Sequence, residues 1–179
     1  GAVSTRDISK VLLEGLRRLE YRGYDSAGIA VIGNSQAICR IRAQGKVQAL
    51  ADAMRSQKIS GNAGIAHTRW ATHGVPSEIN AHPHLSKNSL AIVHNGIIEN
   101  YVNLRNKLIE LGYEFTSDTD SEVTAHLIHY HFNKSNSLVK GVQAAAQEMH
   151  GAFAIGVIAM SRPDELVAVR KGSPLVIGV

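Results

Sequence analysis

The sequence of 179 residues predicts a single domain of the α+β class. Stretches with apolar residues at helical spacing alternate with short apolar runs that are typical of strands. Several of these runs follow one another closely, and such neighbours pair antiparallel because a parallel crossover needs about a dozen residues. The order of elements therefore favours antiparallel sheets layered with helices over a doubly wound parallel sheet.

Two helices are expected in the N-terminal part of the chain. Thr5 or Asp7 is predicted to cap the first, and Gly23 to end it. The apolar stripe of this helix consists of Ile8, Val11, Leu12, Leu16 and Leu19. The second, shorter helix is marked by Val47, Leu50, Ala51 and Met54.

Two paired strands are expected between these helices. Residues 27–32 form an apolar run and residues 37–42 alternate in character, with the turn signal Gly33-Asn34 between them. Cys39 lies in the second run and is interpreted as a small core residue. It is the only cysteine, so an internal disulfide is excluded, which is compatible with a cytoplasmic protein.

The rest of the chain continues the mixed pattern. Strands are predicted over 63–68 and 90–94, and the connection 69–88 between them is long enough to suggest a functional loop. The later elements are a helix marked by Leu104, Leu108 and Leu111 and stopped by Gly112, helices over 121–132 and 138–149, strands over 152–160 and 166–169 around the turn Arg162-Pro163-Asp164, and a final strand over 175–179. Because the chain stops within this last strand, we expect it to be truncated there.

Composition limits the classes of function. Hydrophobic residues make up 44% and charged residues 19%, and no apolar run approaches the ~20 residues of a membrane-spanning helix. The formal charge of +4 comes from scattered lysines and arginines without a dense basic run. Neither a membrane nor a nucleic acid is therefore an expected partner.

Polar residues concentrate in five short segments, each at a predicted strand end or helix start. Functional groups are often found at such positions because the element is rigid and the loop provides reach. The segments are Tyr21–Gly28, His67–Gly74, Asn80–His84, His94–Gly96 and Ser117–Glu122.

Each segment alone also has a purely structural interpretation. Arg22 with Asp25 fits a surface ion pair beside a glycine turn, and Arg69 with Trp70 fits a stacked surface pair. Asn95-Gly96 is a common hairpin turn. Residues 118–122 could simply cap a helix, with Asp120 and Glu122 near its N-terminus, and His67 and His94 fit ordinary strand histidines.

The nine histidines raise the question of a metal site. His82 and His84 alternate, while His126 and His129 lie one helical turn apart. Metal sites usually add carboxylate or thiolate ligands at a recognisable spacing, and no such pattern is found. Pro83 favours a loop, so no metal is predicted.

Together and in this order, the five segments resemble the N-terminal-nucleophile, or type 2, glutamine amidotransferases. Within that superfamily they are most similar to the branch that aminates fructose 6-phosphate to glucosamine 6-phosphate. The resemblance implies a four-layer αββα sandwich with two mainly antiparallel sheets. It spans residues 1–179, a domain truncated at both ends, without the sugar isomerase domains that follow it in the family.

The resemblance also implies catalytic roles. In the family an N-terminal cysteine attacks the side-chain amide of glutamine, and its own α-amino group, with an ordinary pKa of about 7.7–8.0, acts as the base. Ammonia leaves, and water releases glutamate from the thioester. Asn95, through its side-chain amide, and Gly96, through its backbone N–H, match the two donors to the oxyanion.

Substrate-binding roles follow at the matching positions. Arg69 matches the residue that holds the α-carboxylate of glutamine, and Asp120 the residue that accepts from its α-ammonium. Trp70, Thr72 and His73 lie in the stretch 69–77, which matches the loop that covers glutamine. Arg22 matches an active-site arginine near the nucleophile.

One departure is decisive. The family begins Cys-Gly-Ile-Val-Gly, and Gly1 matches the last glycine, so the nucleophile lies upstream of Gly1 and this chain is expected to be inactive. The expected partners are glutamine and, through the absent isomerase domains, fructose 6-phosphate; the whole protein is expected to be a cytoplasmic homodimer without a cofactor. Two alternatives are another amidotransferase of this superfamily with a different acceptor, and a catalytically dead glutamine-binding module.

Overall fold

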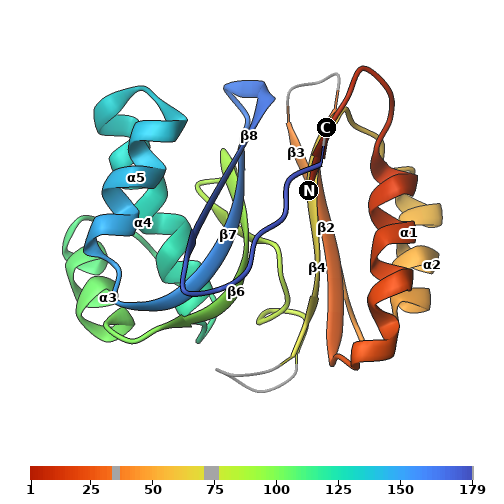
Figure 1. The fold of residues 1–179 in the computed structure, drawn as a ribbon, viewed down its shortest axis with the longest axis horizontal. Coiled ribbons are helices and arrows are strands. Elements are labelled where there is room, and N and C mark those ends of the chain that lie inside the picture. Colours follow the sequence, from red (N-terminus) through yellow and green to blue (C-terminus); the bar gives the residue numbers. More distant parts are fainter. Residues whose placement is uncertain (34–36, 71–76, 179) are drawn as a thin grey trace.

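The structure is a computed structural model that describes residues 1–33, 37–70 and 77–178. The protein has four layers, which Figure 1 shows edge-on. Two sheets face each other in the middle. On the outside of one sheet lie α1 (Ser9–Leu19) and α2 (Val47–Gln57). On the outside of the other lie α3 (Tyr101–Glu110), α4 (Asp120–Ser135) and α5 (Leu138–Glu148). This arrangement confirms the expected αββα sandwich.

Each sheet has four strands, and every pairing between the named strands is antiparallel. The order in the first sheet is β1 (Ala2–Val3), β4 (Ala63–Arg69), β2 (Ser26–Ile32), β3 (Ile38–Gln44). The order in the second sheet is β5 (His84–Ser86), β6 (Leu90–Ile98), β7 (Gly151–Ala159), β8 (Arg162–Lys171). The predicted pairing of the two early strands is confirmed as the hairpin of β2 and β3.

Three apolar clusters fill the three interfaces between the layers. The alternation of β2 shows how one strand serves two of them: Ile29 and Val31 pack toward α1 and α2, while Ala30 and Ile32 face the other sheet. All four side chains are buried. The third cluster lies between the second sheet and α3, α4 and α5, and includes Leu90, Ile92, Leu127 and Phe153. Burying one such side chain stabilises the fold by about 1.5–3 kcal/mol.

The start of α1 differs from the prediction. The helix begins after Ile8 without a side-chain cap, so neither Thr5 nor Asp7 is the cap residue. Asp7 still accepts a 3.1 Å hydrogen bond from the backbone N–H of Ser9, and the same oxygen accepts from Gly61. The α-helix itself ends at Leu19, earlier than predicted, but a short 3-10 turn (Glu20–Arg22) continues it and ends at Gly23, whose φ is 75°.

Two predictions near the C-terminus were wrong. The turn between the last strands lies at residues 160–161, and Arg162, Pro163 and Asp164 already belong to β8. The expected final strand is not formed over residues 175–178, which have no regular structure, and Val179 lies outside the described residues.

The prediction of Cys39 as a core residue was also wrong, because its side chain is exposed. Cys39 shares a face with Ile41, which is buried beneath α2. However, β3 is an edge strand, and Cys39 lies near its beginning, beside Gln57 and Lys58 at the last turn of α2. The helix therefore covers Ile41 but leaves Cys39 open to solvent.

In the described parts of the chain, no helix has the length and apolar character that crossing a bilayer requires.

Candidate active site

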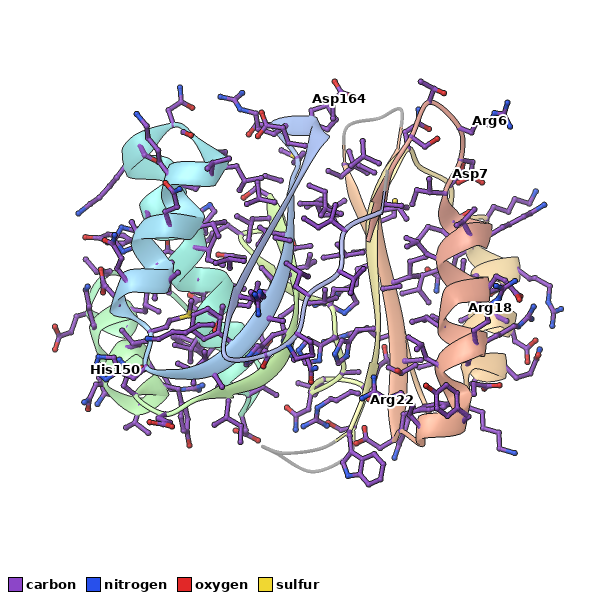
Figure 2. All side chains as sticks on the ribbon, in the orientation of Figure 1. Arg6, Asp7, Arg18, Arg22, His150 and Asp164 are labelled. Atoms are coloured by element: carbon purple, nitrogen blue, oxygen red, sulfur yellow. The ribbon has the colours of Figure 1, made fainter. Side chains whose placement is uncertain are left out.

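A pocket of about 450 Å³ opens between the two sheets, at the end of β4 and the middle of β6. Figure 2 shows Arg22 at this end of the sandwich and Asp164 at the opposite end. The first sheet and its connections contribute Leu19, Arg22, Gly23, His67, Thr68, Arg69 and Trp70. The second sheet and α4 contribute His94, Asn95, Gly96, Ile97, Thr119 and Ser121, and His82 comes from the connection between the sheets. All five predicted segments therefore contribute residues to the pocket.

Arg69 is the cation at the end of β4. Its side chain is only 4% exposed, and its guanidinium lies 3.6 Å from a carboxylate oxygen of Asp25. The backbone N–H of Asp25 donates to the Arg69 carbonyl at 2.8 Å, so the two residues are joined through main chain and side chain. The interpretation of Arg69 and Trp70 as a stacked surface pair is wrong, because Arg69 is buried whereas Trp70 is 69% exposed.

Asn95 and Gly96 lie inside β6, so the hairpin-turn interpretation is wrong. They pair with Ala154 and Phe153 of β7. Gly96 has a φ of 140°, and a Cβ there would collide with the carbonyl oxygen of Ala152. A glycine is therefore required at this position, and the exposed Asn95 side chain stands beside it at the pocket.

The first turn of α4 forms the floor beside these residues. Thr119 is the cap, since its hydroxyl accepts from the backbone N–H of Glu122. Asp120 is 3% exposed, and its carboxylate accepts a 2.8 Å hydrogen bond from the backbone N–H of Ile98. Thus the predicted substrate-binding residue Asp120 does not itself line the pocket, although both of its neighbours do.

The carboxylate of Glu122 secures the loop that leads into α4. It accepts from the backbone and hydroxyl groups of both Thr116 and Ser117, at 2.6–3.1 Å. Burial by itself raises the pKa of Glu122, but these hydrogen bonds outweigh it and hold the pKa below its ordinary value. The helix-capping interpretation of residues 118–122 is therefore right in part, with Thr119 as the cap and Glu122 as a loop anchor.

Histidines form a neutral wall behind the pocket. The rings of His67 and His82 lie 4.3 Å apart, and those of His82 and His84 lie 4.9 Å apart. Burial, followed by the charges of His94 and Arg69, lowers the pKa of His67 to about 3. Burial also lowers the pKa of His82 and His84 well below the ordinary value. Within residues 1–33, 37–70 and 77–178, no group of three His, Cys, Asp or Glu side chains is arranged to hold a metal ion.

The remaining predicted residues lie at the pocket mouth or outside the described residues. Arg22 is exposed and lines the pocket. The ring of Trp70 packs over Gly23, 3.2 Å from the position a Cβ would take. Thr72 and His73 lie outside the described residues. Ser121 and His82 also line the pocket; both lie within predicted segments, but the sequence analysis gave neither a role at the substrate site.

The fold and pocket together define the class. The structure of this chain is similar to that of the glutamine phosphoribosylpyrophosphate amidotransferase of B. subtilis, solved with ADP and GMP. The two align with a TM-score of 0.72 and 26% sequence identity, over 88% of this chain and 34% of the other. The fold is therefore that of the N-terminal-nucleophile glutamine amidotransferases. Residues 67–178 match the model of the glutamine amidotransferase domain, and the chain belongs to this family.

Curated relatives narrow the comparison further. The chain is 69% identical over 178 residues to a glutamine–fructose-6-phosphate aminotransferase (isomerizing) of Legionella pneumophila strain Paris. It is 58% identical over 179 residues to the enzyme of that name in Acinetobacter baylyi. These alignments cover 99% and 100% of this chain but only 30% and 29% of the relatives. The chain thus corresponds to about a third of each relative.

Proposed function

We propose that this chain is the glutamine-hydrolysing part of an enzyme that aminates fructose 6-phosphate to glucosamine 6-phosphate. The observation that carries the proposal is the pocket in which the cation of Arg69 and the Asn95-Gly96 pair face one space. The 69% identity to an aminotransferase of that name supports the acceptor sugar. The acceptor chemistry would belong to the two thirds of the relatives that this chain does not cover.

Arg69 would bind the α-carboxylate of glutamine. A guanidinium has five N–H donors in a planar fork, so it can hold Asp25 on one side and a substrate carboxylate on the other. Asp25, 3.6 Å away, would keep the guanidinium in place before substrate arrives. Asp120 would accept from the α-ammonium, for which a carboxylate has lone pairs left after bonding the N–H of Ile98.

Asn95 and Gly96 would bind the oxyanion of the tetrahedral intermediate. The N–H of Ile98 points to the α4 side of β6, where Asp120 accepts it. N–H groups two residues apart in a strand point to the same edge, so the N–H of Gly96 is directed to that side as well. Together with the Asn95 amide it would present two donors where negative charge develops.

The nucleophile would be an N-terminal cysteine four residues before Gly1. In β1, Ala2 pairs with Gly64 and Val3 with Ala63. If a preceding Cys-Gly-Ile-Val segment continued this register along β4, its cysteine would lie opposite Arg69, at the pocket. The thiol would add to the side-chain amide carbon while its own amine takes the proton, then returns it to the leaving ammonia.

The remaining predicted residues would enclose the substrate. Trp70 with Thr72 and His73 would exclude water from the thioester and retain ammonia, and Arg22 would lie near the nucleophile. The proposal also includes that the whole protein is a cytoplasmic homodimer and uses no organic cofactor.

The experiment compares ammonia release from glutamine by three proteins: this chain, its Cys39→Ser variant, and a version with Cys-Gly-Ile-Val rebuilt before Gly1 and a free N-terminus. Only the rebuilt version is expected to turn over. Activity in the chain that begins at Gly1, abolished by Cys39→Ser, would overturn the assigned nucleophile. Glutamine binding without turnover in the rebuilt protein would instead support a dead binding module, and transfer to an acceptor other than fructose 6-phosphate by the full-length protein would support the other amidotransferase.

A further inference from the structure

Ser121 occupies an unusual position at the first turn of α4. Its hydroxyl oxygen lies 2.9 Å from Nε2 of His82, 2.9 Å from Nδ1 of His94 and 3.4 Å from Oδ1 of Asp120. All four residues are at least 95% buried. One hydroxyl therefore joins α4, β6 and the connection that carries His82.

The donors and acceptors at this oxygen balance in one arrangement. A serine hydroxyl donates once and accepts twice. If it donates to Asp120, both imidazoles donate to it, and each neutral ring has one N–H to give. For His82 this places the proton on Nε2 and leaves Nδ1 as an acceptor, which agrees with the lack of a partner for Nδ1 among the described residues. The lowered pKa of His82 is consistent with a neutral ring.

These contacts hold β6 on both sides of the Asn95-Gly96 pair. His94, which Ser121 contacts, comes directly before Asn95. Ile98, whose N–H bonds to Asp120, comes two residues after Gly96. Two consecutive residues of α4 thus secure the strand at both ends of the segment that carries the proposed oxyanion donors. The anchor is itself fixed by the Thr119 cap.

We infer that Ser121 is a positioning residue for glutamine hydrolysis, which acts by holding His94 and thereby the Asn95 amide in the geometry that stabilises the oxyanion. The inference rests on the proposed function. Donors to an oxyanion act through fixed placement, and a misplacement of about 1 Å costs on the order of 10²-fold in rate. Loss of the Ser121 hydroxyl should therefore lower kcat far more than it weakens glutamine binding, because Arg69 and Asp120 would both remain to bind glutamine.

The experiment measures glutaminase kcat and KM in the full-length protein with its N-terminal cysteine. Ser121→Ala is expected to lower kcat by about 10–10²-fold with glutamine KM within about threefold. Ser121→Thr keeps the hydroxyl and should restore kcat to within about threefold of the parent. Ser86→Ala is the matched control, because Ser86 is fully buried and bonds His126 at 2.8 Å but does not line the pocket.

The inference is overturned if Ser121→Ala keeps the parental kcat, whether or not its KM rises. It is also overturned if Ser86→Ala lowers kcat as much as Ser121→Ala does. Should Ser121→Ala fail to fold, the inference is tested by comparing kcat in His94→Asn and His94→Leu. Asparagine keeps a donor near the Nδ1 position, so it should retain kcat where leucine loses it, and equal kcat in the two variants contradicts the inference. Asn95→Ala in the same series tests the oxyanion site itself: if it alone loses activity, the proposed function stands and only the role of Ser121 fails.

Discussion

The carboxylate of Asp120 accepts a 2.8 Å hydrogen bond from the backbone N–H of Ile98. This bond fastens the first residue of α4 to β6, two residues beyond Gly96. Asp120 therefore has two separable tasks in the proposed site: its charge would hold the substrate ammonium, and its oxygen atoms support the strand that carries the oxyanion donors. Substitutions that remove only one of these properties can distinguish them.

Asp120→Asn removes the charge but keeps an oxygen that can accept from Ile98. We expect a higher glutamine KM, with kcat/KM lower by about 10–150-fold, since a charge-assisted contact contributes about 1.5–3 kcal/mol. Asp120→Ala also removes the acceptor and should lower kcat in addition. Steady-state glutaminase kinetics in the protein with its N-terminal cysteine measure both effects. Asp118→Asn, at an exposed aspartate two residues earlier, is the control, and unchanged kinetics in Asp120→Asn would exclude the ammonium contact.

Asn95→Ala should act on the chemical step. Loss of one oxyanion donor lowers kcat by on the order of 10²–10³-fold, and KM should change far less because ground-state glutamine carries no oxyanion. The same kinetic assay, with a folded protein verified by circular dichroism, checks this expectation. Hydrolysis within about threefold of the parent rate would reduce Asn95 to a structural residue of β6.

Much of the fold could be predicted from the sequence because apolar residues recur at the spacing of helices or gather in short runs typical of strands. The helix marked by Val47, Leu50, Ala51 and Met54 has all four of these side chains buried, and β2 matches its predicted range to within one residue. The order of strands in the sheets could not be predicted, since β6 pairs with β7 across more than fifty residues of intervening chain. Such contacts depend on tertiary packing, which local patterns do not encode.

The candidate site was predicted from residue types at strand ends. What the sequence did not reveal about the site depends on how neighbouring strands pair and pack. Asn-Gly strongly favours a hairpin turn when isolated, but here Asn95 and Gly96 continue β6 because β7 pairs with the whole segment. For Asp120, the sequence did not indicate that its carboxylate accepts from the N–H of Ile98, or that its neighbours Thr119 and Ser121 line the pocket. Side-chain direction at a helix start depends on the neighbouring strand, which the sequence alone did not reveal.

The lowered pKa of Glu122 predicts that the fold loses stability in acid. Its pKa is held below the ordinary value, so its hydrogen bonds stabilise the protein fully above the pKa of the unfolded state, and this contribution is lost as pH falls through the lowered pKa. Glu122→Gln should lower the free energy of unfolding at pH 7 by about 1.5–3 kcal/mol and weaken the dependence on pH below about 4.5. Denaturant unfolding between neutral and acid pH measures this. Glu14→Gln, at an exposed ion pair with Arg18, should change little, and an equal effect of both variants would contradict the role of Glu122.

Substitution by alanine at Gly28 and at Gly15 is expected to change the stability of the fold in opposite directions. A Cβ at Gly28 in β2 would collide with the carbonyl oxygen of His82 and lie 3.0 Å from that of Ile41. The segment that delivers His82 to the pocket thus packs directly on the glycine backbone. Gly28→Ala should destabilise the fold by about 1–3 kcal/mol, because neither carbonyl can move without disturbing a strand or the pocket wall.

Gly15 lies in α1, and a Cβ there would meet nothing within 4 Å. Gly15→Ala should therefore stabilise the protein by about 0.5–1 kcal/mol, since alanine loses less backbone freedom than glycine in a helix. Thermal unfolding of both variants measures the difference, at about 2–4 °C per kcal/mol for a domain of this size. The two melting temperatures should move in opposite directions from the parent. If Gly28→Ala melted at or above the parent temperature, the backbone of β2 and the His82 segment could not be in the close contact that places His82 against Ser121.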